Sequence, residues 1–178
     1  MNARFATAVA AALILVSACA DASAHVALEA KQAKVGAGYK AVLGVPHGCE
    51  GQPTTEVIVD IPEGVIGVKP MPKPGWTLAI INGTYSKPYT LRGAKLTEGV
   101  TEIAWSGGKL PDAHYDEFVF AGAIAQELAA GTTIHFPVVQ ECETGVHRWI
   151  DIPKGHTSDG HGAGAAEPAP GLRLLPQR

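Results

Sequence analysis

The chain has 178 residues, of which 46% are hydrophobic and 17% are charged, and its formal net charge is −3. This apolar content is enough for a folded core and excludes a wholly disordered chain, and without a basic excess the chain is not expected to bind nucleic acid. The length fits one domain. Its 21 glycines and 13 prolines suit short strands joined by turns better than a helical bundle.

Residues 1–24 have the features of a secretory signal peptide. Arg4 supplies a positive charge, residues 8–16 are apolar, and Ala22-Ser23-Ala24 fits an A-x-A cleavage site. The apolar stretch is too short to cross a bilayer as a helix, and no later segment reaches that length. We therefore expect a periplasmic or secreted protein with no stable membrane span. Residues 16–19 also resemble a lipoprotein box, which would instead anchor the protein through a lipid on Cys19.

Cleavage after Ala24 leaves two cysteines, Cys49 and Cys142. An even number of cysteines in an exported protein favours a disulfide bond. Two free thiols or a pair of metal ligands are the alternative. The two residues are too far apart for a CxxC motif, so redox catalysis is not expected.

A pattern of strands and turns runs from His25 to about Pro153. In residues 54–61, the apolar residues Val57, Val59 and Ile61 recur at every second position, which is typical of a strand with one buried face. The expected strands are 26–30, 39–45, 54–61, 76–81, 102–105, 117–123, 132–139 and 146–152. Breakers at 73–75, 81–83 and 106–108 separate them, and 126–130 is the only helical hint. The pattern predicts an all-β, antiparallel β-sandwich over residues 25–154.

Residues 155–178 are rich in Gly, Ala and Pro and show no periodicity, so we expect a flexible tail. Two histidines, His156 and His161, lie in its GHTSDGHG stretch. Weak metal binding and a merely solvated spacer explain this stretch equally well.

His25 becomes the first residue if the signal is cleaved after Ala24. Its free α-amine and its own Nδ1 can then chelate one metal ion in a six-membered ring. Two nitrogen donors favour Cu(II) over Zn(II). The same histidine within a longer chain cannot offer the amine, and the alternative is a histidine that follows the cleavage site by chance.

Several short motifs, each present once, follow one another in a specific order along the core. They are HVALEAKQA at 25–33, VPHGC at 45–49, PTT at 53–55, IPEGV at 61–65, KP at 69–70, PGW at 74–76, WSGG at 105–108, DEFVF at 116–120, QEC at 140–142 and Trp149. Together they resemble the YcnI-like copper-binding domain of bacterial envelope proteins.

The resemblance implies an immunoglobulin-like or cupredoxin-like β-sandwich that holds Cu(II) through the amine and imidazole of His25. It implies that Trp149 lies close to the copper. It also implies a role in envelope copper uptake or homeostasis, with a copper-transport membrane protein or another periplasmic copper carrier as partner. Many relatives have Glu where this chain has Gln32, and a neutral amide would donate less charge to Cu(II) if that position helps the site.

Trp149 and His147 share one face of the expected strand VHRWIDI, because residues two apart lie on the same side. An indole is a poor σ-donor, so we interpret Trp149 as a lid or cation–π partner over the metal; a core tryptophan is the alternative. His147, Glu29 and Glu117 are weaker ligand candidates. Asp116 precedes Glu117 on the opposite face, so at most one of the two should face the site.

Motifs for catalysis are lacking, since the sequence contains neither a GxSxG elbow nor an HExxH helix. We therefore expect a carrier or metallochaperone and not an enzyme. Two alternatives remain open. One is a copper-dependent oxidase or oxygenase in which His147 supplies a second histidine, and the other is a structural interaction sandwich without metal.

Overall fold

The computed structural model describes residues 25–152 and 167–177, so the expected signal peptide, Cys19, His156 and His161 lie outside the described part. The described residues form twelve strands and no helix, and none of them belongs to a helix that could cross a membrane. The strands are β1 (Ala27–Leu28), β2 (Gln32–Lys34), β3 (Gly38–Val45), β4 (Thr54–Asp60), β5 (Val65–Pro70), β6 (Thr77–Leu91), β7 (Ala94–Leu110), β8 (Asp116–Ile124), β9 (Thr133–His135), β10 (Val138–Cys142), β11 (Val146–Trp149) and β12 (Gly171–Leu175).

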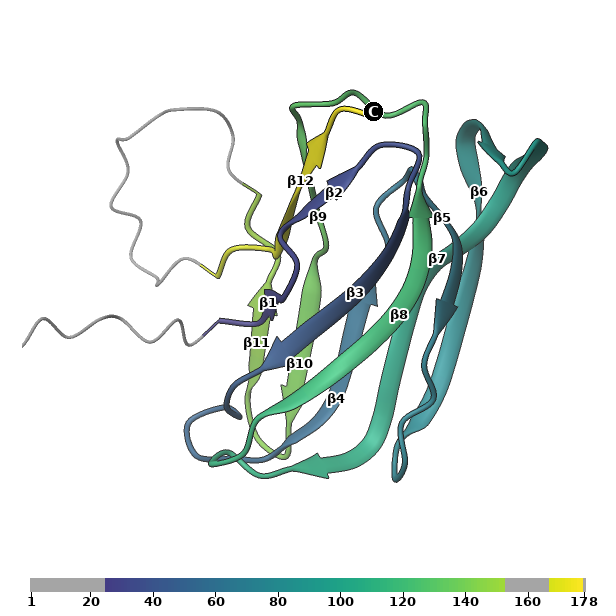
Figure 1. Ribbon diagram of the computed structural model, residues 1–178. Helices are drawn as coiled ribbons and strands as arrows, with labels where there is room; N and C mark the ends of the chain where they lie inside the picture. The colour runs from purple at the N-terminus through teal and green to yellow at the C-terminus, as the bar shows by residue number, and fades with distance from the viewer. Residues whose placement is uncertain (1–24, 153–166, 178) are drawn as a thin grey trace, which may run out of the picture.

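Two antiparallel sheets face each other as a sandwich, which confirms the predicted fold class (Figure 1). One sheet has the strand order β1-β3-β8-β5, and the other has the order β11-β10-β4-β7-β6. A smaller sheet, β2-β12-β9, lies at one end of the sandwich (Figure 1). Strands β1 and β11 are both edge strands, and the candidate site residues His25 and Trp149 lie on or next to them.

The core between the sheets follows from alternation along the strands. In β4, Val57 and Val59 have no exposed surface, and they pair in register with Trp105 and Ile103 of β7. Phe118 of β8 contacts the Trp105 ring edge-on, with the ring centroids 5.5 Å apart. Burial of such apolar side chains contributes roughly 1.5–3 kcal/mol each and holds the two sheets together.

The long hairpin of β6 and β7 differs from the expectation. The predicted breakers at 81–83 and 106–108 lie within these strands. A register shift between Ile81 and Asn82 absorbs the first, and a shift between Thr54 and Glu56 in the pairing of β4 with β7 absorbs the second, so neither ends the pairing. The chain instead reverses at Arg92 and Gly93, which both have positive φ angles (51° and 83°). Two consecutive residues in the left-handed backbone conformation form a tight hairpin turn whose twist matches that of the flanking strands.

Two further expectations are wrong in detail. Residues 126–130 form turns and not a helix. The expected strand 132–139 is divided, because β9 belongs to the small sheet and β10 to the five-stranded sheet. Pro137 lies between them and cannot donate a backbone hydrogen bond, which makes it a natural place for the chain to change sheets.

The expected flexible tail over 155–178 is wrong for its described part, residues 167–177. Strand β12 lies between β2, to which it is parallel, and β9, to which it is antiparallel. Leu172 and Leu174 have no exposed surface, whereas Arg173 between them is exposed. This short alternation is itself a strand signal, but the Gly- and Pro-rich composition around it hides it. The domain therefore extends well beyond residue 154.

The predicted disulfide is present between Cys49 and Cys142, with a Cα–Cα distance of 6.0 Å. Cys49 lies in the loop after β3 of the first sheet, and Cys142 ends β10 of the second sheet. The bond therefore links the two layers across 93 positions of sequence.

Replacing both cysteines by serine should lower the free energy of unfolding by about 2–5 kcal/mol, because the unfolded chain gains the freedom of a long open loop. Urea denaturation of this variant and of the oxidised parent protein measures the difference. An unchanged unfolding midpoint would contradict the structural role of the bond.

Leu174→Ala should destabilise the protein by about 2–5 kcal/mol, because it removes a fully buried side chain from the core. The matched control is Arg173→Ala, the exposed neighbour in the same strand, which should change the stability by less than about 0.5 kcal/mol. Equal, small effects of both substitutions would show that β12 is not part of the folded domain.

Candidate metal centre

His25 lies two residues before the start of β1, against the ring of Trp149. The two ring centroids are 5.1 Å apart and the planes make an angle of 70°, so the contact is edge to face. His25 also lines a hollow of about 210 Å³ together with Lys31 and residues 168–171. The structure thus brings together His25 and Trp149, two residues that the family resemblance places at one site, and adds a wall from the C-terminal segment.

Trp149 is both a core residue and a neighbour of His25. Its side chain is almost fully buried, and its Nε1 donates a hydrogen bond to Oε1 of Gln140 at 3.1 Å. The Gln140 amide is wholly buried and in turn donates from Nε2 to the His47 carbonyl (2.6 Å) and to Oγ1 of Thr54 (2.8 Å). A buried amide with its partners satisfied is rigid, so the indole is held in one orientation toward His25.

The ring of His147 stacks on the same indole. Its ring centroid is 5.0 Å from that of Trp149 with an interplanar angle of 28°, and the His47 ring is 5.8 Å away at 85°. His25, Trp149, His147 and His47 therefore form a continuous row of four aromatic rings. The shared strand face of His147 and Trp149, inferred from the sequence, is confirmed by this stacking.

Glu167 joins this row from the C-terminal segment. Its Oε1 lies 2.5 Å from Nδ1 of His147, and its Oε2 accepts a hydrogen bond from the backbone N–H of Arg148 at 2.6 Å. Partial burial pushes the pKa of Glu167 upward. The hydrogen bonds from His147 and Arg148 and the positive charges of His147 and His25 outweigh this, so the pKa lies below its usual value. Sequence reasoning missed Glu167 because it falls in the segment expected to be a flexible tail.

Two other predicted candidates, Glu29 and Glu117, gather around Tyr115 instead. Tyr115 donates a hydrogen bond to Oε1 of Glu117 at 3.1 Å. The pKa of Tyr115 is raised by burial, by this hydrogen bond and by the negative charges of Glu117, Glu29 and Asp116. Asp116 itself forms an ion pair with Lys73 at 2.6 Å. These contacts tie the acidic residues to the Tyr115 side of the first sheet.

Gln32 lies in β2 opposite Arg173 of β12. Its side chain is exposed.

The donors that the protein can offer a metal are few. Among the described residues, no group of three or more His, Cys, Asp or Glu side chains is arranged to hold a metal ion. The two described cysteines are used by the disulfide. After cleavage at Ala24, the imidazole and the free α-amine of His25 could together hold a metal ion.

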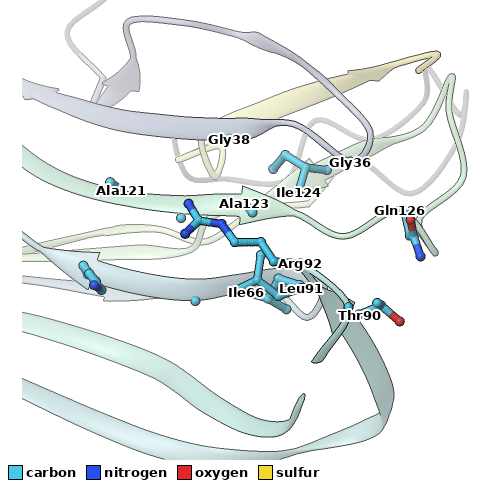
Figure 2. A pocket seen from close by; sticks show the side chains of 14 residues that line it. Gly36, Gly38, Ile66, Thr90, Leu91, Arg92, Ala121, Ala123, Ile124 and Gln126 are labelled. Atoms are coloured by element: carbon cyan, nitrogen blue, oxygen red, sulfur yellow. The ribbon is translucent and has the colours of Figure 1, made fainter. Parts of the chain in front are cut away.

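Another hollow, of about 630 Å³, lies between β5, β8 and the turn of the β6–β7 hairpin. Figure 2 shows Arg92, Leu91 and Ile66 among the residues that line it. Most of the described lining residues are glycine, alanine or aliphatic, and none of the candidate metal ligands is among them. This hollow therefore contributes nothing to the His25 site.

Comparison with known proteins bears on the fold and on the domain limits. The model of a family described as "Domain of unknown function (DUF1775)" matches residues 25–174, a span that includes most of β12. A crystal structure of an uncharacterized protein from Nocardia farcinica with an immunoglobulin-like fold is similar, with a TM-score of 0.60 and 24% identity. The match covers 86% of this chain and 99% of that one, and it shows the shared fold. No curated protein sequence matches the chain.

The low pKa of Glu167 makes stability depend on pH. A carboxylate with a depressed pKa stabilises the folded state above its unfolded pKa, and this contribution is lost as the pH falls through the folded value. The parent protein should therefore lose stability relative to Glu167→Gln as the pH falls below about 4.3, the ordinary glutamate pKa. Urea unfolding of both proteins between pH 3 and pH 7 tests this, and a difference that is constant across this range would contradict it.

Proposed function

The chain belongs to the DUF1775 family, and on that premise we propose that it is an exported Cu(II)-binding protein related to the YcnI-like copper-binding proteins. It holds copper through the processed N-terminal His25 and passes it on in envelope copper uptake or homeostasis. The observation that carries the proposal is the contact of His25 with the fixed, buried indole of Trp149.

The position of His25 supports a terminal chelate. The family match begins at residue 25, which directly follows the Ala22-Ser23-Ala24 cleavage site of the sequence. Cleavage there gives His25 a free amine beside its own imidazole, and two nitrogen donors suit Cu(II). The residue lies next to an edge strand and lines a hollow, so a bound ion would be accessible to a partner.

Trp149 would serve as one wall of this site. Its Nε1 is engaged by Gln140, so the indole presents its ring to the metal side and not a donor atom. The quadrupole of an aromatic ring attracts a nearby cation. The bulk of the indole also restricts the number of additional ligands that can reach the metal. Such a site holds copper without enclosing it.

Release by ligand exchange follows from the same donor set. A partner that supplies stronger or more numerous ligands can take the open positions and then displace the two nitrogens of His25. We therefore propose a carrier or metallochaperone and not an enzyme. Its partner would be a copper-transport membrane protein or another periplasmic copper carrier, and the protein would act in the periplasm or outside the cell.

Blocking the α-amine of His25 with an acetyl group tests the proposal. The acetyl group leaves every side chain in place but converts the α-amine into an amide, so Cu(II) affinity should fall roughly 100-fold or more as the chelate is lost. Isothermal titration of Cu(II) into the chain that starts at a free His25 and into the acetylated chain measures the change. Electron paramagnetic resonance should show two nitrogens on copper in the unacetylated protein.

The acetylated chain should keep its unfolding midpoint, which separates a lost chelate from a lost fold. His114→Ala, in an exposed loop of the described structure, is the matched histidine control and should leave Cu(II) affinity unchanged. Equal Cu(II) affinity of the acetylated and unacetylated chains would overturn the proposal.

A further inference from the structure

The hollow beside the turn of the β6–β7 hairpin takes no part in the His25 site, but it has the size of a ligand site. Its volume of about 630 Å³ falls within the roughly 300–1,000 Å³ that is usual for small-molecule sites. Its floor is the outer face of the first sheet, where Gly38 of β3, Ala123 of β8 and Ile66 of β5 pair in register. The neighbouring Tyr39 and Ile124 belong to the core on the opposite face. The hairpin turn forms a wall beside this floor (Figure 2).

Small side chains keep the floor of this hollow open. A Cβ atom added at Gly38 would meet only the Gly122 carbonyl oxygen, at 3.9 Å, so a larger residue there would occupy the hollow. Ala123 adds only a methyl group to the floor. Leu91 of β6 and Ile66 of β5 supply larger apolar surface at the side. The hollow therefore suits the apolar part of a ligand that lies against the sheet.

Two cations line the same hollow. Lys69 comes from β5 and Arg92 from the hairpin turn, and Figure 2 shows the Arg92 side chain extended into the hollow. Neither side chain forms an ion pair with a residue that the structure describes. None of the described lining residues is acidic. Glu127 is close to the rim, but it accepts a hydrogen bond from the backbone N–H of Thr90 at 2.9 Å and is not part of the lining. Both positive charges are therefore available to a ligand.

Lys40 adds a third positive charge near this hollow. It lies in the same cross-strand row as Lys69, with Ala121 between them. Its side chain is exposed and forms no ion pair within the described part of the chain. Three cations on one face of a protein with a net charge of −3 create a local positive potential, which attracts anions.

The backbone of Arg92 is an unfavourable place for an arginine. Its φ angle is 51°, and Gly93 follows with 83°. Two-residue turns with this geometry are normally made by Asn-Gly or Asp-Gly, because residues with longer side chains are disfavoured in the left-handed region. Strained residues of this kind are concentrated at binding sites. The strain at Arg92 places a guanidinium in the hollow that a better turn residue would not supply.

We propose that this hollow binds a small organic anion. Its phosphate or carboxylate head pairs with Arg92 and Lys69, and its apolar body lies on the small-residue floor against Leu91 and Ile66. A guanidinium suits both kinds of head, because it can donate two parallel hydrogen bonds to either one. The site is separate from His25 and does not depend on copper.

Octyl phosphate and octanoate, each kept below its micelle concentration, are the probes. The protein is the chain that starts at His25, without added metal. Isothermal titration should show saturable binding of at least one of the two anions to a single site, and ¹⁵N spectra should show shifts at the amides of Gly38, Gly93 and Ala123. Inorganic phosphate, which has only the head, and octanol, which has only the tail, should each bind at least tenfold more weakly.

Substitutions test the two parts of the site. Arg92→Asn should lower the affinity for the anion at least tenfold while the unfolding midpoint does not fall, because Asn-Gly is the preferred sequence for this turn. The matched control is Lys95→Asn, which removes the same charge from an exposed position of the same hairpin outside the hollow and should leave the affinity unchanged. Gly38→Leu should lower the affinity at least tenfold by filling the floor.

Three results would overturn the inference: binding of neither amphiphilic anion, equally tight binding of octanol, or an equal loss of affinity in Arg92→Asn and Lys95→Asn. Binding of only one of the two anions supports the site and identifies its head group as phosphate or carboxylate. No copper is present in these titrations, so their outcome is independent of the proposed Cu(II) chelate at His25.

Discussion

The wholly buried amide of Gln140 bonds to three partners that come from different parts of the chain. It accepts from the indole of Trp149, donates to the hydroxyl of Thr54 and donates to the carbonyl of His47. An unsatisfied amide in this position would cost about 1–3 kcal/mol, so the three partners are held together. That constraint fixes the orientation of Trp149, whose indole contacts the rings of both His25 and His147.

The sandwich explains why these residues meet. Strands β1 and β11 are edges of different sheets, and the Cys49–Cys142 bond links the layers near the same end of the ring row. The C-terminal segment then runs beside β11 and contributes Glu167. A site at the edges of two sheets is rigid on its core side and open on the other, which is the arrangement expected of a carrier that must both hold an ion and release it.

Much of this could be predicted from the sequence where the signal is local. The period-two pattern of β4 and the shared face of His147 and Trp149 depend only on spacing. The pairing of Cys49 and Cys142 was predicted from the even number of cysteines expected in an exported chain. The part played by Gln140 could not be predicted, because one polar residue in an apolar strand does not reveal its partners. Glu167 was missed because β12, which follows it closely, is only five residues long and its alternation is masked by Gly and Pro nearby.

The terminal chelate depends on where the exported chain begins, so the most direct measurement is the N-terminal mass of the protein recovered from its native cell. The account predicts a chain that starts at His25 with an unmodified α-amine. A chain that starts at a lipid-modified Cys19, or at any other residue, would contradict it. In that case the sandwich and its ring row remain, but His25 has no amine with which to hold copper.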